Sequence, residues 1–92
     1  MFLLALLLPG CVLDRAAQTE FVEKGYSVSG KNPFRFEVDQ QVLRQWGGAG
    51  SPRFNQVLEE ELERLRLCRN GYALRNEGVR EGVYSVTGRC KS

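Results

Sequence analysis

The chain has 92 residues, of which 42% are hydrophobic and 26% charged, a composition that suits one small globular domain and argues against wholesale disorder. Thirteen Lys and Arg residues against eleven Asp and Glu give a formal net charge of +2. The basic residues alternate with acids instead of forming a stripe, so we expect no nucleic-acid partner. A chain of this size buries only roughly 60–65% of its unfolded surface, so its core is marginal unless a covalent staple supports it.

An uninterrupted apolar run occupies residues 2–8 and is closed by Pro9, Gly10 and Cys11. A helix of that length spans about 10–12 Å, far short of the ~30 Å hydrocarbon core of a bilayer. The run also has no polar face, which argues against a buried amphipathic helix. Its length and position predict the apolar region of a secretory signal peptide.

The residues Leu8-Pro9-Gly10-Cys11 resemble the lipobox of bacterial lipoproteins, in which a leucine stands three residues before a cysteine and a small residue stands just before it. The resemblance implies signal cleavage between Gly10 and Cys11, a diacylglycerol on the Cys11 sulfur and an acyl chain such as palmitate on the new amine. That chemistry needs a thiol to accept the lipid and a small residue at the cleavage position. Pro9 and the absence of Lys or Arg before the apolar run depart from the family's usual pattern.

The same resemblance implies how the chain is organised. Residues 1–10 form a signal peptide, residues 11–20 a lipidated cysteine and tether, and residues 21–92 a small periplasmic domain. An aspartate directly after the lipidated cysteine tends to retain lipoproteins in the inner membrane of enteric-type bacteria. Position 12 is Val12, so the resemblance implies the outer membrane, facing the periplasm. The membrane is then a partner through Cys11, and an envelope protein or glycan is the second expected partner.

Two runs of period-two alternation predict a first hairpin. Residues 26–29 alternate Tyr and Val with serines, and residues 34–38 alternate Phe, Phe and Val with Arg and Glu. Residues 30–33, Gly-Lys-Asn-Pro, supply the turn between them.

Two helices follow. Asp39 is a suitable N-cap for a short helix over residues 40–46, which Gly47 ends. Ser51 and Pro52 then provide an N-cap and a first helical residue. The second helix is expected to run to Asn70-Gly71 with one apolar face, made by Phe54, Leu58, Leu62, Leu65 and Cys68.

The last part of the chain predicts a second hairpin with strands at 72–75 and 83–90 and a turn over 76–82. Tyr72 and Tyr84 are expected to lie across from each other in it. The sequence thus predicts an α+β domain of order ββ(α)αββ, in which a small antiparallel sheet of two hairpins packs against one amphipathic helix. The order of the strands cannot be derived from the sequence.

The three cysteines predict one disulfide. If Cys11 carries lipid, Cys68 and Cys90 remain as a pair in a compartment where disulfides persist. Cys68 falls on the apolar face of the predicted helix, and Cys90 shares strand parity with the apolar residues of the last strand. Closing this loop is worth roughly 3 kcal/mol in the chain-entropy model.

We predict no enzyme. The chain has no histidine, which removes the commonest general base and zinc ligand, and the cysteines are already assigned. The remaining general acid–base candidates are carboxylates on the polar side of the second helix, and we interpret them as a solvated face: Glu59, Glu60, Glu61 and Glu63. No cofactor or metal site is expected.

Aromatic side chains are the remaining binding candidates. Trp46, Tyr72 and Tyr84 are candidate partner contacts, with burial in the core as the favoured reading of Trp46 and packing that of both tyrosines. The leading hypothesis is a lipid-anchored envelope lipoprotein that acts as a structural or protein-interaction module. The alternative is an inhibitor or immunity-type protein that binds a periplasmic enzyme.

Overall fold

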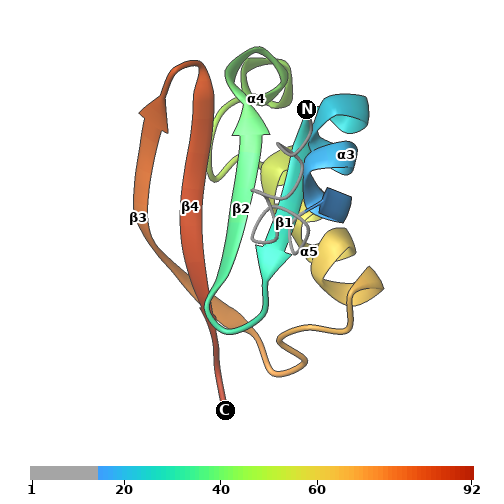
Figure 1. The fold of residues 1–92 in the computed structure, drawn as a ribbon. Helices are drawn as coiled ribbons and strands as arrows, with labels where there is room; N and C mark the ends of the chain where they lie inside the picture. The colour runs from blue at the N-terminus through green and yellow to red at the C-terminus, as the bar shows by residue number, and fades with distance from the viewer. Residues whose placement is uncertain (1–14) are drawn as a thin grey trace, which may run out of the picture.

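The computed structural model describes residues 15–92, with side chains from Gln18 onward. An antiparallel four-stranded sheet of order β1-β2-β4-β3 packs against helices, which confirms the predicted α+β class (Figure 1). The elements are, in chain order, α3 (Arg15–Lys24), β1 (Tyr26–Gly30), β2 (Phe34–Asp39), α4 (Gln40–Trp46), α5 (Pro52–Arg64), β3 (Tyr72–Arg80) and β4 (Val83–Cys90). The predicted signal peptide and the lipidation site at Cys11 lie outside the described residues.

The first hairpin forms as the alternation predicts. Val28 pairs with Phe36, and both point to the face covered by α5. Along β2 the apolar residues are buried while Arg35 between them is exposed. Because side chains alternate across a strand, one face of this hairpin joins the core and the other meets solvent.

Both predicted helix starts are confirmed at the level of individual hydrogen bonds. The Asp39 carboxylate accepts from the backbone N–H groups of Gln41 and Val42, at 3.0 and 3.4 Å. The Ser51 hydroxyl oxygen accepts from the Phe54 N–H at 3.2 Å. These bonds satisfy N–H groups that have no partner within the helix, so each cap fixes where its helix begins.

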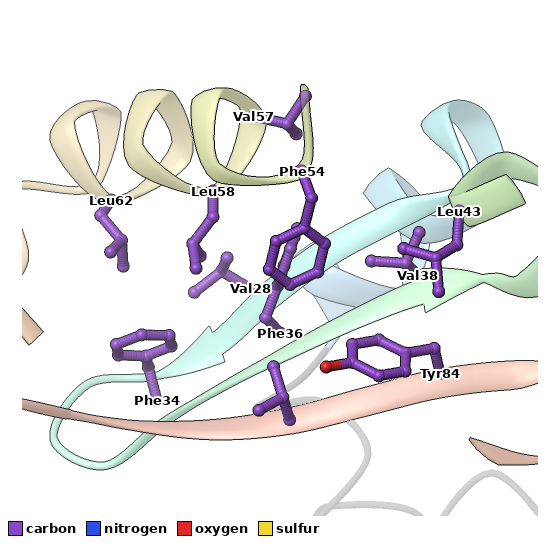
Figure 2. Packing of buried hydrophobic residues seen from close by; sticks show 11 residues of the cluster. Val28, Phe34, Phe36, Val38, Leu43, Phe54, Val57, Leu58, Leu62 and Tyr84 are labelled. Atoms are coloured by element: carbon purple, nitrogen blue, oxygen red, sulfur yellow. The ribbon is translucent and has the colours of Figure 1, made fainter. Parts of the chain in front are cut away.

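The core lies between α5 and one face of the sheet (Figure 2). Three phenylalanines are at most 1% exposed, namely Phe34, Phe36 and Phe54. Gly88 on β4 lies under the Phe34 ring so closely that a Cβ there would overlap the ring. The cluster comprises Val28, Phe34, Phe36, Val38, Leu43, Phe54, Val57, Leu58, Leu62, Tyr84 and Val86.

The second hairpin differs from the sequence-based prediction. Strand β3 continues to Arg80, so the turn consists of Glu81 and Gly82 alone instead of residues 76–82. Both turn residues have positive φ, 52° and 80°, the conformation of a type I′ turn that matches the twist of paired strands. The glycine and asparagine that suggested a loop belong instead to a β-bulge between Arg75 and Gly78.

The predicted pairing of Tyr72 with Tyr84 is therefore wrong. Tyr72 pairs with Cys90, and Tyr84 pairs with Val79. A two-residue turn fixes the register from the closed end of the hairpin, and the bulge then shifts it by one residue, so that strand parity alone is not enough to give partners.

Helix α3 covers the outer edge of β1 (Figure 1). The boundary expected between tether and domain, after Glu20, falls inside this helix. Arg64 Nη2 lies 2.8 Å from Glu20 Oε2, and Lys24 Nζ lies 4.0 Å from Glu61 Oε2. These ion pairs link α3 to α5.

Candidate functional site

A candidate site begins where α5 ends. The prediction that the helix continues to Asn70 is wrong, because Arg66 adopts a left-handed φ of 59°. The Leu67 N–H then donates to the Leu62 carbonyl at 2.8 Å, and the Arg66 N–H donates to the Glu63 carbonyl at 3.0 Å. This pair of bonds is the Schellman ending, in which an apolar residue beyond the helix packs back on its last turn. Leu67 packs in this way against the core.

Cys68 consequently lies in the turn after α5 and not on the helix face, with a left-handed φ of 54°. The disulfide to Cys90 nevertheless forms, which confirms the predicted bridge, with the two Cα atoms 4.7 Å apart. It ties the turn to the end of β4, next to Tyr72, which pairs with Cys90. The bridge therefore holds one end of the second hairpin against the end of α5.

A groove of about 940 Å³ lies between the end of α5, this turn and the start of β3. Leu62 and Leu67 give it an apolar base, and two glutamates and two arginines also line it. Because both signs of charge line it, the groove suits a protein segment with mixed charges better than it suits a polyanion. Its lining is Glu59, Leu62, Glu63, Arg66, Leu67, Cys68, Arg69, Gly71 and Tyr72.

Tyr72 is the aromatic residue of this groove. Its ring meets the Phe34 ring edge-on at a centroid distance of 6.1 Å, and its hydroxyl donates to Glu59 Oε2 at 3.3 Å. Burial, followed by the charge and the hydrogen bond of Glu59, raises the pKa of Tyr72 to about 12. The hydroxyl is therefore a protonated hydrogen-bond donor at neutral pH, and the half-buried ring offers one face to a ligand.

Trp46 closes the opposite end of the core. The indole is half-buried and contacts the rings of Tyr26, Phe36 and Phe54 at centroid distances of 5.5, 6.5 and 6.5 Å. Trp46 is far from the groove in the fold, because it ends α4 whereas the groove lies beyond the other end of α5.

Tyr84 is a core residue and is only 5% exposed. Its hydroxyl donates to Glu77 Oε1 at 2.8 Å, and Glu77 lies in the bulge of β3. Burial and then this hydrogen bond raise the pKa of Tyr84 well above its ordinary value. The three aromatic candidates are thus not brought together, and Tyr72 is the one that lines the groove.

The acidic residues of α5 do not all form a solvated face. Glu59, Glu60 and Glu63 are exposed as expected, but Glu61 is only 5% exposed, which corrects that expectation. Glu61 accepts hydrogen bonds from Arg64 Nη2 and Nε at 2.7 and 3.4 Å, which compensates for its burial. Its position seven residues after the buried Phe54 was the available signal, because that spacing puts both on one helix face.

The groove, with an apolar base and a charged rim, has the composition of a recognition surface. Within residues 15–92, no group of three or more cysteines and acids is placed to hold a metal ion. Sequence reasoning missed the groove because its arginines and Leu67 belong to a turn that was predicted to be helix. The lipidation site Cys11 and the cleavage position Gly10 lie outside the described part of the chain.

No helix in the described part of the chain has the length and apolar character needed to cross a membrane. Comparisons with protein-family models, with curated proteins and with solved structures find no match to this chain.

Proposed function

We propose that this protein is a lipoprotein of the bacterial outer membrane, anchored through Cys11, whose periplasmic domain is a structural or protein-interaction module without catalytic activity. The observation that carries the proposal is the Cys68–Cys90 disulfide. It uses two of the three cysteines, and the third ends the Leu-Pro-Gly-Cys motif that follows an apolar run.

The disulfide supports export. Such bonds persist in oxidising compartments such as the periplasm and are rare in the bacterial cytosol. A signal peptide with a lipid-accepting cysteine delivers a domain to that compartment, so the bridge and the motif support the same location.

The groove beside Tyr72 supports the interaction role. It joins an apolar base to a rim of both charges, which is the composition of a protein-recognition surface with an apolar centre and a polar rim. The proposed partner is another envelope protein that inserts a segment at this groove.

The first experiment measures the intact mass of the protein from membranes, before and after reduction and alkylation. We expect a mass that lacks residues 1–10 and is raised by acyl chains, with two cysteines alkylated only after reduction. An unprocessed mass with three freely alkylated thiols would overturn the proposal.

The second experiment tests the groove in living cells. A photo-crosslinking amino acid at Arg69, on the rim, is expected to give a discrete crosslinked product that saturates with expression level. The same residue at Arg53, exposed on the first turn of α5, is the matched control and is expected to give none. No product at either position contradicts the interaction role, and an enzyme captured at Arg69 and inhibited by the protein would favour an inhibitor or immunity function.

A further inference from the structure

The face of the sheet opposite α5 carries three arginines around one threonine. In the strand register, Arg35 on β2 and Arg75 on β3 are both partners of Thr87 on β4, and Arg89 lies two residues further along β4. Paired strands lie about 4.8 Å apart and a two-residue step covers about 7 Å, so the three arginines surround Thr87 within roughly 10 Å. All three side chains are exposed. We call Arg35, Arg75 and Arg89 the arginine face.

The strands place few acids on this face of the sheet. Glu37 is the acid nearest to the arginine face along β2, with Oε2 3.3 Å from Arg35 Nε. Asp39 is used as the cap of α4, and the Glu77 carboxylate is hydrogen-bonded to a core tyrosine. The glutamates of α5 lie on the opposite side of the sheet. The arginine face is therefore basic even with Glu37 beside it.

Helix α3 attaches on the same side as the arginine face. Phe21 and Val22 of α3 line a shallow hollow together with Ser29 and Arg35 of that face. Val22 is 82% exposed and is therefore free to contact another surface.

The link to the anchor is short. Only four residue steps separate Cys11 from Arg15, the first residue of α3, and four residues span at most about 14 Å. A lipid on Cys11 would therefore hold α3, and the sheet face beside it, close to the bilayer surface.

We infer that the arginine face lies against the anionic phospholipid headgroups of the leaflet that holds the anchor, with Val22 at the same surface; this inference rests on the proposed lipidation of Cys11. Guanidinium groups bind phosphate oxygens in a bidentate manner, and the Thr87 hydroxyl adds a donor between them. Each basic residue at an anionic surface strengthens association about fivefold, so three arginines together contribute on the order of 100-fold. The groove beside Tyr72, on the far side of the sheet, stays open to the periplasm in this orientation.

The test uses the full chain as isolated from membranes, labelled with ¹⁵N-arginine and placed in lipid nanodiscs that contain a headgroup-nitroxide lipid. In phosphatidylglycerol discs, the Nε–H signals of the arginine face should broaden several-fold more than those of Arg44 and Arg53 on the helices. The excess should vanish in phosphatidylcholine discs and at about 0.5 M NaCl, which screens surface charge.

Two matched triple variants show whether the position of the arginines or the net charge of the protein causes the broadening. The variants are labelled uniformly with ¹⁵N so that the Thr87 backbone amide can be observed. In R35Q/R75Q/R89Q, the excess broadening that this amide shows in the unchanged protein should be lost, because the population with this face against the lipid falls by on the order of 100-fold. In R44Q/R53Q/R69Q, which removes the same charge elsewhere, it should persist.

The outcomes distinguish the inference from the function on which it rests. Equal broadening on both sides of a chain whose mass shows acyl groups would overturn the inference and leave the anchor intact. Lipid-dependent broadening of the arginine signals in a chain without acyl groups would support the arginine face as a lipid-binding surface. It would contradict the proposed lipidation of Cys11. A response to inorganic phosphate with none to phosphatidylglycerol would overturn the membrane as the ligand.

Discussion

The two hairpins of the sheet are stabilised in different ways. In the β1–β2 hairpin, Phe34 and Phe36 are fully buried under α5, and α3 covers the free edge of β1. In the β3–β4 hairpin, seven of the nine residues of β3 are exposed, and Val79 is 54% exposed. Burial supports the first hairpin, whereas β3 depends on its pairing with β4 and on the two ends of the second hairpin.

The ends of the second hairpin explain how an exposed edge strand is held. The Cys68–Cys90 disulfide fixes one end, and the tight turn at Glu81 and Gly82 fixes the other. The bulge and the charge of Arg75 also discourage pairing with strands of other molecules. A domain of this size is too small to cover both edges of the sheet. The disulfide and the tight turn therefore stabilise the edge strand that burial does not.

Among the variants proposed, the one that removes the disulfide should widen the difference in stability between the two hairpins most. The double variant Cys68→Ala/Cys90→Ala should lose roughly 3 kcal/mol of unfolding free energy, because the bridge closes a loop between residues 22 apart in sequence. Urea denaturation measures the loss. Hydrogen exchange should accelerate more at 72–75 than at 34–38, and equal acceleration in both hairpins would contradict the comparison.

The next test compares two glycines of the second hairpin. Gly88→Ala should cost about 2–3 kcal/mol, because the added Cβ overlaps the ring of Phe34. Gly78→Ala is the matched control, since a Cβ there meets nothing within 4 Å, and it should change stability by less than about 0.5 kcal/mol. Similar losses in both variants would mean that packing over Gly88 is not tight.

Alkaline pH should lower the free energy of unfolding through Tyr72, which lies in the second hairpin. The pKa of Tyr72 is about 12 in the folded protein and about 10 when unfolded, so the unfolded state loses its proton first. The stability tied to this proton is complete below about pH 10 and falls as pH rises from 10 towards 12. Urea midpoints at several pH values should fall less steeply in Tyr72→Phe, and identical slopes would show that Tyr72 is not responsible.

The smallest effect is expected at the turn. Glu81 holds a φ of 52° at the first position of a type I′ turn, where asparagine is preferred. Glu81→Asn should therefore stabilise the protein by about 0.5–1 kcal/mol in thermal or urea denaturation. Glu81→Gln removes the same charge without the conformational preference, so an equal gain in that variant would assign the effect to charge.

Local signals predicted much of the fold. The caps at Asp39 and Ser51, the alternation of 34–38 and the disulfide partners were all readable from the sequence. Capping and alternation depend on residues within a few positions of each other, which is why the sequence reports them directly.

The candidate site was less predictable. The groove exists because Arg66 leaves the helix and Leu67 returns to the core, although the helical periodicity continues through Cys68. Packing against distant strands outweighed that periodicity, which is a weak local preference. Tyr72 was recognised as a binding candidate, but its neighbours were not.

The sequence by itself determined the first hairpin, the starts of α4 and α5, the class of the fold, the pairing of Cys68 with Cys90, and the motif that suggests lipidation at Cys11. Only the tertiary structure decided the strand order, the register that surrounds Thr87 with arginines, and the burial of Glu61, which lies within 4.0 Å of Lys24 in α3. Strand pairing and the burial of a charge depend on segments far apart in the chain. Their free energies become favourable only once those segments have met.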